Sequence, residues 1–170
     1  GINIPTPSSL RFHECLRHQV SGRYLPAMIA AVTIWPGDEV AGIHRTYLKS
    51  DGSGKADVDP NKMSLGPIAG GAVRLGTPAA QMAIAEGIED GITILQETGM
   101  SVWAATSASA LRSMALPALP MASEVVICAD PDPAGRRAAA GAAERWASEG
   151  RAVSVATPPV GKDFNDVLRG

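Results

Sequence analysis

Residues 124–150 constrain the fold of this chain more than any other segment. They begin with an apolar, β-branched run at 125–128, which is typical of a strand buried on both faces of a parallel sheet. The tripeptide Asp-Pro-Asp follows at 130–132, and an alanine-rich stretch from Pro133 then favours a long helix. A buried strand that leads directly into a helix is half of a βαβ unit, so the sequence predicts an α/β domain.

The rest of the second half repeats this alternation of strand and helix. Further strands are predicted at 81–85, 101–105 and 151–156. Helices are predicted at 90–98, where Gly99 ends the helix, and at 107–114. Strands and helices that alternate at this spacing predict a parallel sheet with flanking helices and right-handed crossover connections.

The first half has a different pattern and is expected to form a smaller, mixed α+β subdomain. Two β-favouring runs, 25–34 and 40–48, flank the turn cluster Trp-Pro-Gly-Asp-Glu. This arrangement indicates an antiparallel hairpin. Residues 49–62 are polar and rich in Gly, Ser and Asp, so we expect a loop there.

The two halves also differ in charge, and we place the domain boundary between residues 77 and 78. Residues 1–77 contain eight Lys or Arg and six Asp or Glu, a net charge of +2. Residues 78–170 contain seven basic and eleven acidic residues, a net charge of −4. This split suits a protein whose first half contacts polyanions and whose second half holds cations.

Composition predicts a soluble globular protein. Hydrophobic residues make up 45% of the chain and charged residues 19%. The longest apolar runs are shorter than the roughly 20 residues of a membrane span, and no secretory signal opens the sequence. Cys15 and Cys128 are too few to staple the fold, and two free thiols fit a cytoplasmic location.

Acidic residues stand where the predicted parallel strands end. Glu86 follows the first strand of the second half, Asp130 and Asp132 follow the third, and Asp163 lies after the fourth. Open parallel sheets bind ligands outside the carboxyl ends of their strands. Carboxylates crowded together repel one another unless a cation neutralises them, and hard oxygen ligands suit Mg²⁺ or Mn²⁺. The pattern therefore predicts a metal site formed by Glu86, Asp130 and Asp132.

A simpler interpretation of the same residues remains open. Asp132 would cap the helix that begins at Pro133, and Glu86 with Gly87 would form an ordinary turn after a strand. Asp90 would only complement the dipole at the start of its helix. The joint position of the three carboxylates at two strand ends favours the metal site.

Three motifs of the second half resemble those of Toprim domains. The sequence Glu-Gly-Ile-Glu-Asp at 86–90 resembles the Glu-Gly-x-x-Asp signature, and residues 125–135 resemble the strand that ends in Asp-x-Asp. Residues 161–166 resemble the Lys-Asp segment that closes this domain in primases, including the primase-helicases of phages and plasmids. The motifs occur in the family's order over about half of the chain, so the resemblance implies a Toprim-like Rossmannoid sheet.

The resemblance also implies roles for the acidic residues. Asp130 and Asp132 would ligate Mg²⁺ or Mn²⁺, and Glu86 would act as a general acid or base or contact the metal through water. Asp90 would orient a ligand or bond to the backbone. Asp163 would cap the last helix or lie close to the metal.

Two segments of the first half resemble the N-terminal subdomain of the primase polymerase core. Residues 40–45 resemble its strand with Gly and Arg, and residues 61–64 resemble its Lys-containing segment, although Met63 replaces the usual aromatic residue. By this resemblance Arg45 and Lys62, together with Lys162 of the second half, would bind template or nucleotide phosphates.

A basic subdomain that precedes a Toprim domain is the order found in primases. The resemblance therefore implies DNA-dependent synthesis of an RNA primer from ribonucleotides, a role in DNA replication, and a zinc-binding domain and a helicase domain or subunit as partners outside this segment.

Two other functions stay open, a Toprim-type nuclease and a non-catalytic nucleic-acid-binding module of a replication protein. A topoisomerase needs a tyrosine nucleophile, and both Tyr24 and Tyr47 lie outside the second half. Aromatic residues make up only 4% of the chain, which argues against a single-strand binder that works by base stacking.

Overall fold

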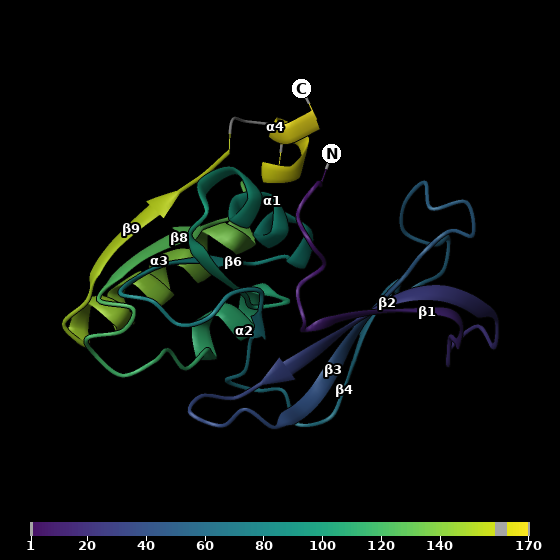
Figure 1. Ribbon diagram of the computed structural model, residues 1–170, viewed down its shortest axis with the longest axis horizontal. Helices are drawn as coiled ribbons and strands as arrows, with labels where there is room; N and C mark the ends of the chain where they lie inside the picture. Colours follow the sequence, from purple (N-terminus) through teal and green to yellow (C-terminus); the bar gives the residue numbers. More distant parts are fainter. Residues whose placement is uncertain (1, 159–162, 170) are drawn as a thin grey trace.

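The first half of the chain forms a twisted antiparallel sheet that projects from the rest of the molecule (Figure 1). This computed structural model describes residues 2–158 and 163–169. The strands of the first sheet follow one another in chain order: β1 (Leu10–Arg17), β2 (Tyr24–Thr33), β3 (Val40–Tyr47) and β4 (Lys62–Leu65). The predicted hairpin is confirmed, because β2 pairs with β3 in antiparallel register.

The first half differs from the expected mixed α+β composition, because residues 2–80 contain strands, turns and loops but no helix. Two of its strands, β1 and β4, were not predicted. Most side chains of β1 are exposed, and its alternation of apolar and polar residues stops after four positions, at Glu14. β4 lies at the end of the predicted loop and is only four residues long.

The second half forms the predicted α/β layer structure. Its sheet has the order β5-β7-β6-β8-β9, and β6, β7, β8 and β9 run parallel. The strands are β5 (Val73–Arg74), β6 (Gln81–Ala85), β7 (Ser101–Ala104), β8 (Glu124–Cys128) and β9 (Ala152–Ala156). The helices are α1 (Ile88–Thr98), α2 (Ala108–Ser113), α3 (Pro133–Ser148) and α4 (Phe164–Arg169).

Helices cover both faces of this second sheet. One apolar cluster joins α2 and α3 to the sheet and contains the fully buried side chains of Met82, Ile84, Trp103, Ile127 and Trp146. The other cluster lies on the side of α1, and it also takes in Leu10, Ala30 and Val32 from the first sheet. The two sheets therefore share a core. β5 lies before the predicted boundary at residue 77 and still pairs with β7.

Arg74 holds the β2–β3 turn against the second sheet. Its guanidinium carbon lies 5.3 Å from the ring centre of Trp35 and 4.8 Å from that of Trp103. It also donates hydrogen bonds to Asp38 Oδ1 at 2.8 Å and to the carbonyl of Gly37 at 2.7 Å. These contacts hold the β2–β3 turn against strand β7. No described helix is long and apolar enough to cross a membrane.

Candidate active site

The register of the parallel strands brings Glu86 and Asp130 to the same edge of the sheet. β6 pairs with β8 so that Ala85 lies opposite Cys128. Glu86 is the next residue after β6, and Asp130 lies two residues after β8. Asp132 then begins α3, where its Oδ1 accepts a hydrogen bond from the backbone N–H of Gly135 at 2.7 Å. Asp132 is thus the N-cap that local sequence predicted.

Gly135 allows the carboxylates to lie close to the first turn of α3. A methyl group at this position would meet the carbonyl oxygen of Asp130 at 2.7 Å, its Cβ at 2.9 Å and Glu86 Oε2 at 3.1 Å. A side chain larger than hydrogen would therefore push Glu86 and Asp130 away from the helix. The Asp-Pro-Asp-Pro-Ala-Gly sequence needs its glycine for this close approach.

Burial and neighbouring negative charge raise the pKa values of Glu86 and Asp130. Burial, and after it the charges of Asp130 and Asp132, raise the pKa of Glu86 from 4.5 to about 7, although a hydrogen bond from the backbone of Ala108 opposes this shift. Burial and the charge of Asp132 also raise the pKa of Asp130. At neutral pH this edge of the sheet therefore carries negative charge that the fold itself does not neutralise.

Asp90 and Asp163 fix helix α4 beside this edge. Asp90 Oδ1 accepts a hydrogen bond from the backbone N–H of Asn165 at 3.0 Å, and burial raises the pKa of Asp90 to about 6. Asp163 Oδ1 accepts from the N–H of Asp166 at 2.6 Å, which caps α4. The charge of Asp163 contributes to the raised pKa of Asp130, so this carboxylate also adds to the negative potential.

The three predicted phosphate-binding residues differ in their placement. The charge of Lys62 lowers the pKa of Asp130, against the larger effects of burial and Asp132. Its ammonium group pairs with Glu89 Oε2 at 3.5 Å. Arg45 is only 5% exposed and donates to the carbonyl of Ser64, so its guanidinium does not reach the site. Lys162 lies outside the described residues.

Glu89 is a residue of this region that sequence reasoning missed. It occupies a variable position of the Glu-Gly-x-x-Asp motif, yet its carboxylate bridges Lys62 at 3.5 Å and Lys55 at 3.4 Å. These pairs connect α1 to the β3–β4 region of the first sheet. No pattern in the sequence links Glu89 to lysines that precede it by 27 and 34 positions, because the pairing depends on how the two halves pack.

The donor set at the sheet edge fits a hard divalent cation. Glu86 Oε2 is buried and accepts no hydrogen bond within the described part of the chain, and the neighbouring groups are carboxylates as well. The described side chains contain no group of three His, Cys, Asp or Glu already arranged as a ligand set.

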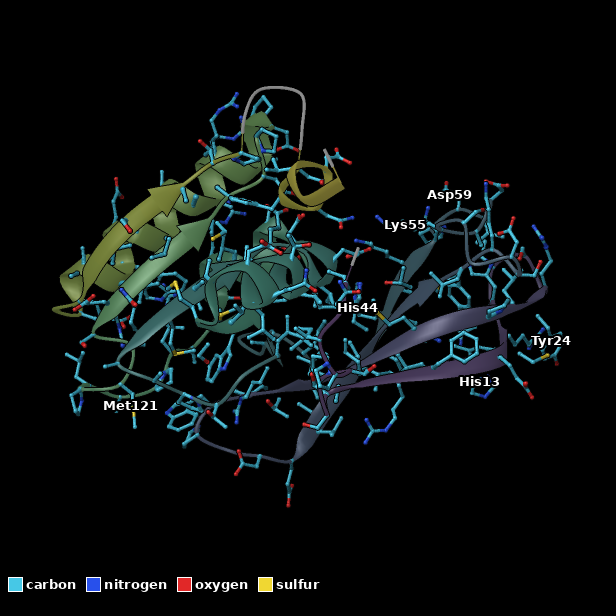
Figure 2. The ribbon with its side chains drawn as sticks, turned by 45° about the horizontal axis from the view of Figure 1, so that its top comes forward. His13, Tyr24, His44, Lys55, Asp59 and Met121 are labelled. Atoms are coloured by element: carbon cyan, nitrogen blue, oxygen red, sulfur yellow. The ribbon has the colours of Figure 1, made fainter. Side chains whose placement is uncertain are left out.

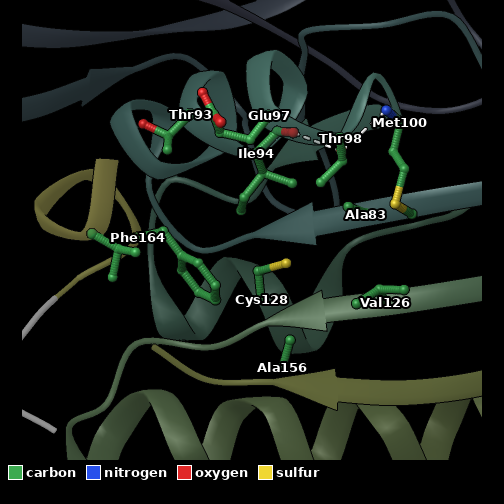
Figure 3. A pocket seen from close by; sticks show the side chains of 11 residues that line it. Ala83, Thr93, Ile94, Glu97, Thr98, Met100, Val126, Cys128, Ala156 and Phe164 are labelled. Atoms are coloured by element: carbon green, nitrogen blue, oxygen red, sulfur yellow. Dashed lines mark hydrogen bonds between the residues drawn. The ribbon is translucent and has the colours of Figure 1, made fainter. Parts of the chain in front are cut away.

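An apolar cavity of about 490 Å³ opens elsewhere, between α1, α4 and the strands (Figure 3). Met100, Cys128 and Phe164 are among the residues that line it. Burial raises the pKa of the Cys128 thiol to about 12, so the thiol stays protonated and unreactive. Neither Glu86 nor Asp130 borders this cavity, and its lining offers no cluster of catalytic groups.

His44 gives a prediction for stability in acid. It is 6% exposed, its Nδ1 lies 3.0 Å from Ser64 Oγ, and burial, with the charges of Lys62 and Arg45, lowers its pKa to about 4. The unfolded chain takes up this proton near pH 6.5, so the stabilisation is complete above pH 6.5 and is lost as pH falls towards 4. We expect the protein to lose about 2 kcal/mol more than His44→Gln between pH 7.5 and 5.

Urea unfolding of both proteins at the two pH values measures this difference. The carboxylates titrate in both proteins and cancel in the comparison. Equal losses in the parent and in His44→Gln would show that His44 is not held neutral in the folded state.

Family models match both halves of the chain. A model described as a Toprim domain matches residues 81–170, and a model described as a domain of unknown function (DUF7146) matches residues 1–75. No curated protein matches the sequence significantly.

Solved structures of primases have a similar fold. A DNA primase domain from Pseudomonas aeruginosa superposes with a TM-score of 0.55 at 18% identity, covering 91% of this chain and 51% of that one. A DnaG primase catalytic domain bound to single-stranded DNA gives 0.55 at 18% identity, with coverages of 91% and 53%. The primase of Aquifex aeolicus, with its zinc-binding and RNA polymerase domains, gives 0.57 at 18% identity, with coverages of 92% and 40%. The present chain thus spans about half the length of these primases.

Proposed function

This chain belongs to the Toprim domain family, and on that premise we propose that it catalyses metal-dependent nucleotidyl transfer, the synthesis of an RNA primer on a DNA template. The observation that carries the proposal is the extent of the fold likeness. The similarity to primase catalytic cores covers about nine-tenths of the chain, and so includes the first sheet as well as the Toprim half. This likeness supports the proposal that Glu86, Asp130 and Lys62 act together in a primase-type site.

We assign the binding of Mg²⁺ or Mn²⁺ to Asp130, Asp132 and Glu86. When bound, such a cation neutralises phosphate charge and polarises the phosphorus–oxygen bond that is to be broken. Glu86 also has a pKa near neutrality in the metal-free protein, so its buried Oε2 is suited to hold or accept a proton. Asp132 Oδ1 caps the first turn of α3, and we assign the metal contact to its other oxygen.

The basic side chains of the first half indicate how a phosphate-bearing substrate would bind. Lys62 interacts electrostatically with Asp130, and we assign it the binding of a phosphate of the nucleotide or the template. By analogy with the Aquifex aeolicus primase we propose that a zinc-binding domain accompanies this chain, and that a helicase domain or subunit supplies the unwound template.

Primer synthesis tests the proposal directly. The protein that carries this chain is incubated with single-stranded DNA and labelled ribonucleotides, with Mg²⁺, with Mn²⁺ or with a chelator. We expect metal-dependent oligoribonucleotides from the parent and a loss of at least a hundredfold in Asp130→Asn. Glu124→Gln is the matched control, because Glu124 lies at the opposite end of the same strand β8 and is exposed.

The same reactions distinguish the two alternatives. Cleavage of labelled DNA or RNA without any synthesis would replace priming by a Toprim-type nuclease function. Binding of DNA without metal-dependent chemistry of either kind, unchanged in Asp130→Asn, would identify a non-catalytic binding module and contradict the proposal.

A further inference from the structure

One face of the first sheet carries a row of side chains that runs from the acidic edge outwards. The register places Phe12 opposite Met28, Met28 opposite Thr46, and Thr46 opposite Lys62. Residues directly opposite in antiparallel strands share a face, so this row crosses all four strands. Tyr24 lies four residues before Met28 in the same strand and therefore shares its face, and Arg17 lies opposite Tyr24.

The side chains of this face become more exposed along β2 from Ala30 towards Tyr24. Ala30 is fully buried, Met28 is partly buried, and Tyr24 is 64% exposed. Helix α1 covers only the inner end, where its Ile92 and the residues Phe12 and Met28 line the same hollow of about 240 Å³. Beyond that point the sheet projects away from α1, and Tyr24 lies at the far end (Figures 1 and 2).

The exposed aromatic side chains are gathered on this face. Phe12 is 69% exposed and Tyr24 is 64% exposed, and within residues 2–158 and 163–167 no other Phe, Tyr or Trp belongs to the exposed class. Tyr47 and Trp103 are buried in the core. The chain has few aromatic residues, but both exposed rings lie on the same face of the first sheet, where bases could stack on them.

Basic side chains accompany these rings. Lys62 belongs to the row of Phe12, and Lys55 pairs with Leu48 at the end of β3, which places it on the same face. Both ammonium groups point towards α1, where Glu89 binds them at 3.5 and 3.4 Å. Arg17 lies beside Tyr24. The face thus combines basic side chains with exposed aromatic rings, although Thr46 in the middle of the row is buried.

We propose that this face binds single-stranded nucleic acid and that bases stack on Phe12 and Tyr24, an inference that rests on the proposed function and assigns the path of its template. Aromatic rings beside a basic groove are the usual means of binding single strands without sequence preference. The two rings are separated by four residues of β2, roughly 13 Å along the strand, so they serve different bases of one strand. Arg17, Lys55 and Lys62 then lie where phosphates pass.

Binding of two oligonucleotides of equal length tests the stacking contacts. One is labelled oligothymidylate and the other is its abasic counterpart, and fluorescence anisotropy gives the dissociation constant of each. We expect Phe12→Ala and Tyr24→Ala each to weaken binding of oligothymidylate about tenfold, with no change for the abasic strand. Met121→Ala is the matched control, since Met121 is 43% exposed and lies on the second half, far from this sheet (Figure 2).

Arg17→Gln separates charge from stacking. We expect it to weaken both oligonucleotides equally and to lower the slope of log K against log salt by about 0.7, the value for one phosphate contact with a single strand. The two alanine variants should leave this slope unchanged. Unaltered melting temperatures would show that these exposed substitutions do not unfold the sheet.

Two results would overturn the proposal. Dissociation constants unchanged in Phe12→Ala and Tyr24→Ala would exclude this face as the strand path, and would leave a protein partner as its occupant. An equal loss for both oligonucleotides would exclude stacking. The binding assay contains no ribonucleotides and requires no catalysis, so a failure of the strand path is distinguishable from a failure of primer synthesis, which is measured separately.

Discussion

Glu86→Gln is expected to stabilise the metal-free protein at pH 8 and to remove its nucleotidyl transfer activity. The pKa of Glu86 is raised from 4.5 to about 7 by burial and by Asp130 and Asp132. The folded protein therefore binds this proton more tightly than the unfolded chain, and the resulting stability is lost as pH rises through 7. At pH 8 the uncharged glutamine avoids the cost of the buried charge, which amounts to at most about 3 kcal/mol.

Urea unfolding in the presence of a chelator measures this effect. The parent should become more stable relative to the variant as pH falls from 8 to 5.5, because Glu86 takes up its proton within that window. Loss of a catalytic acid or base should reduce primer synthesis by a factor of about 10² to 10⁴. Glu124→Gln is the control. Equal stabilities of the parent and Glu86→Gln at pH 8 would show that the charge of Glu86 does not destabilise the folded protein.

Gly135→Ala is expected to disrupt the carboxylate edge from within α3. Its methyl group would lie 2.7 Å from the carbonyl oxygen of Asp130 and 3.1 Å from Glu86 Oε2. Overpacking of this kind costs about 1–3 kcal/mol, which exceeds the gain of up to about 1 kcal/mol from replacing a helical glycine. We expect a net loss of stability and, since Asp130 and Glu86 must move, a loss of activity of at least tenfold.

Gly141→Ala is the matched control, because it lies in the same helix and the nearest atom to its added methyl group is Arg112 Cδ at 3.8 Å. This variant should gain up to about 1 kcal/mol and stay active. Thermal unfolding and primer synthesis of both variants test the pair. If the two substitutions change stability and activity equally, Gly135 is not needed for the close packing of Glu86 against the first turn of α3.

The sequence was most informative where structure depends on neighbouring residues. The apolar run at 125–128 identified a buried strand, and the residues after it could be placed at the carboxyl edge of a parallel sheet. The cap formed by Asp132 was visible because an N-cap and its partner are three positions apart. The Toprim motifs added the likeness to primases, which the family model and the solved structures confirmed.

Features that depend on packing between the halves were not predictable. Strand β1 is exposed over most of its length, so its own sequence gives little sign of a strand. Its pairing with β2 stabilises it as one. Arg45 lies in a predicted strand, but which face of that strand would be covered could not be read from alternation alone. The bridge from Glu89 to Lys55 and Lys62 depends on how α1 packs against the first sheet.

Paramagnetic broadening by Mn²⁺ tests whether Glu86, Asp130 and Asp132 bind a divalent cation. Backbone amide signals of the isotope-labelled protein are recorded while Mn²⁺ is added below one equivalent. We expect the signals of residues 86–87 and 130–135 to disappear first. Asp130→Asn should abolish this selectivity, and Glu124→Gln should retain it. Broadening that is absent at these residues, or identical in Asp130→Asn, would show that these carboxylates do not bind the cation.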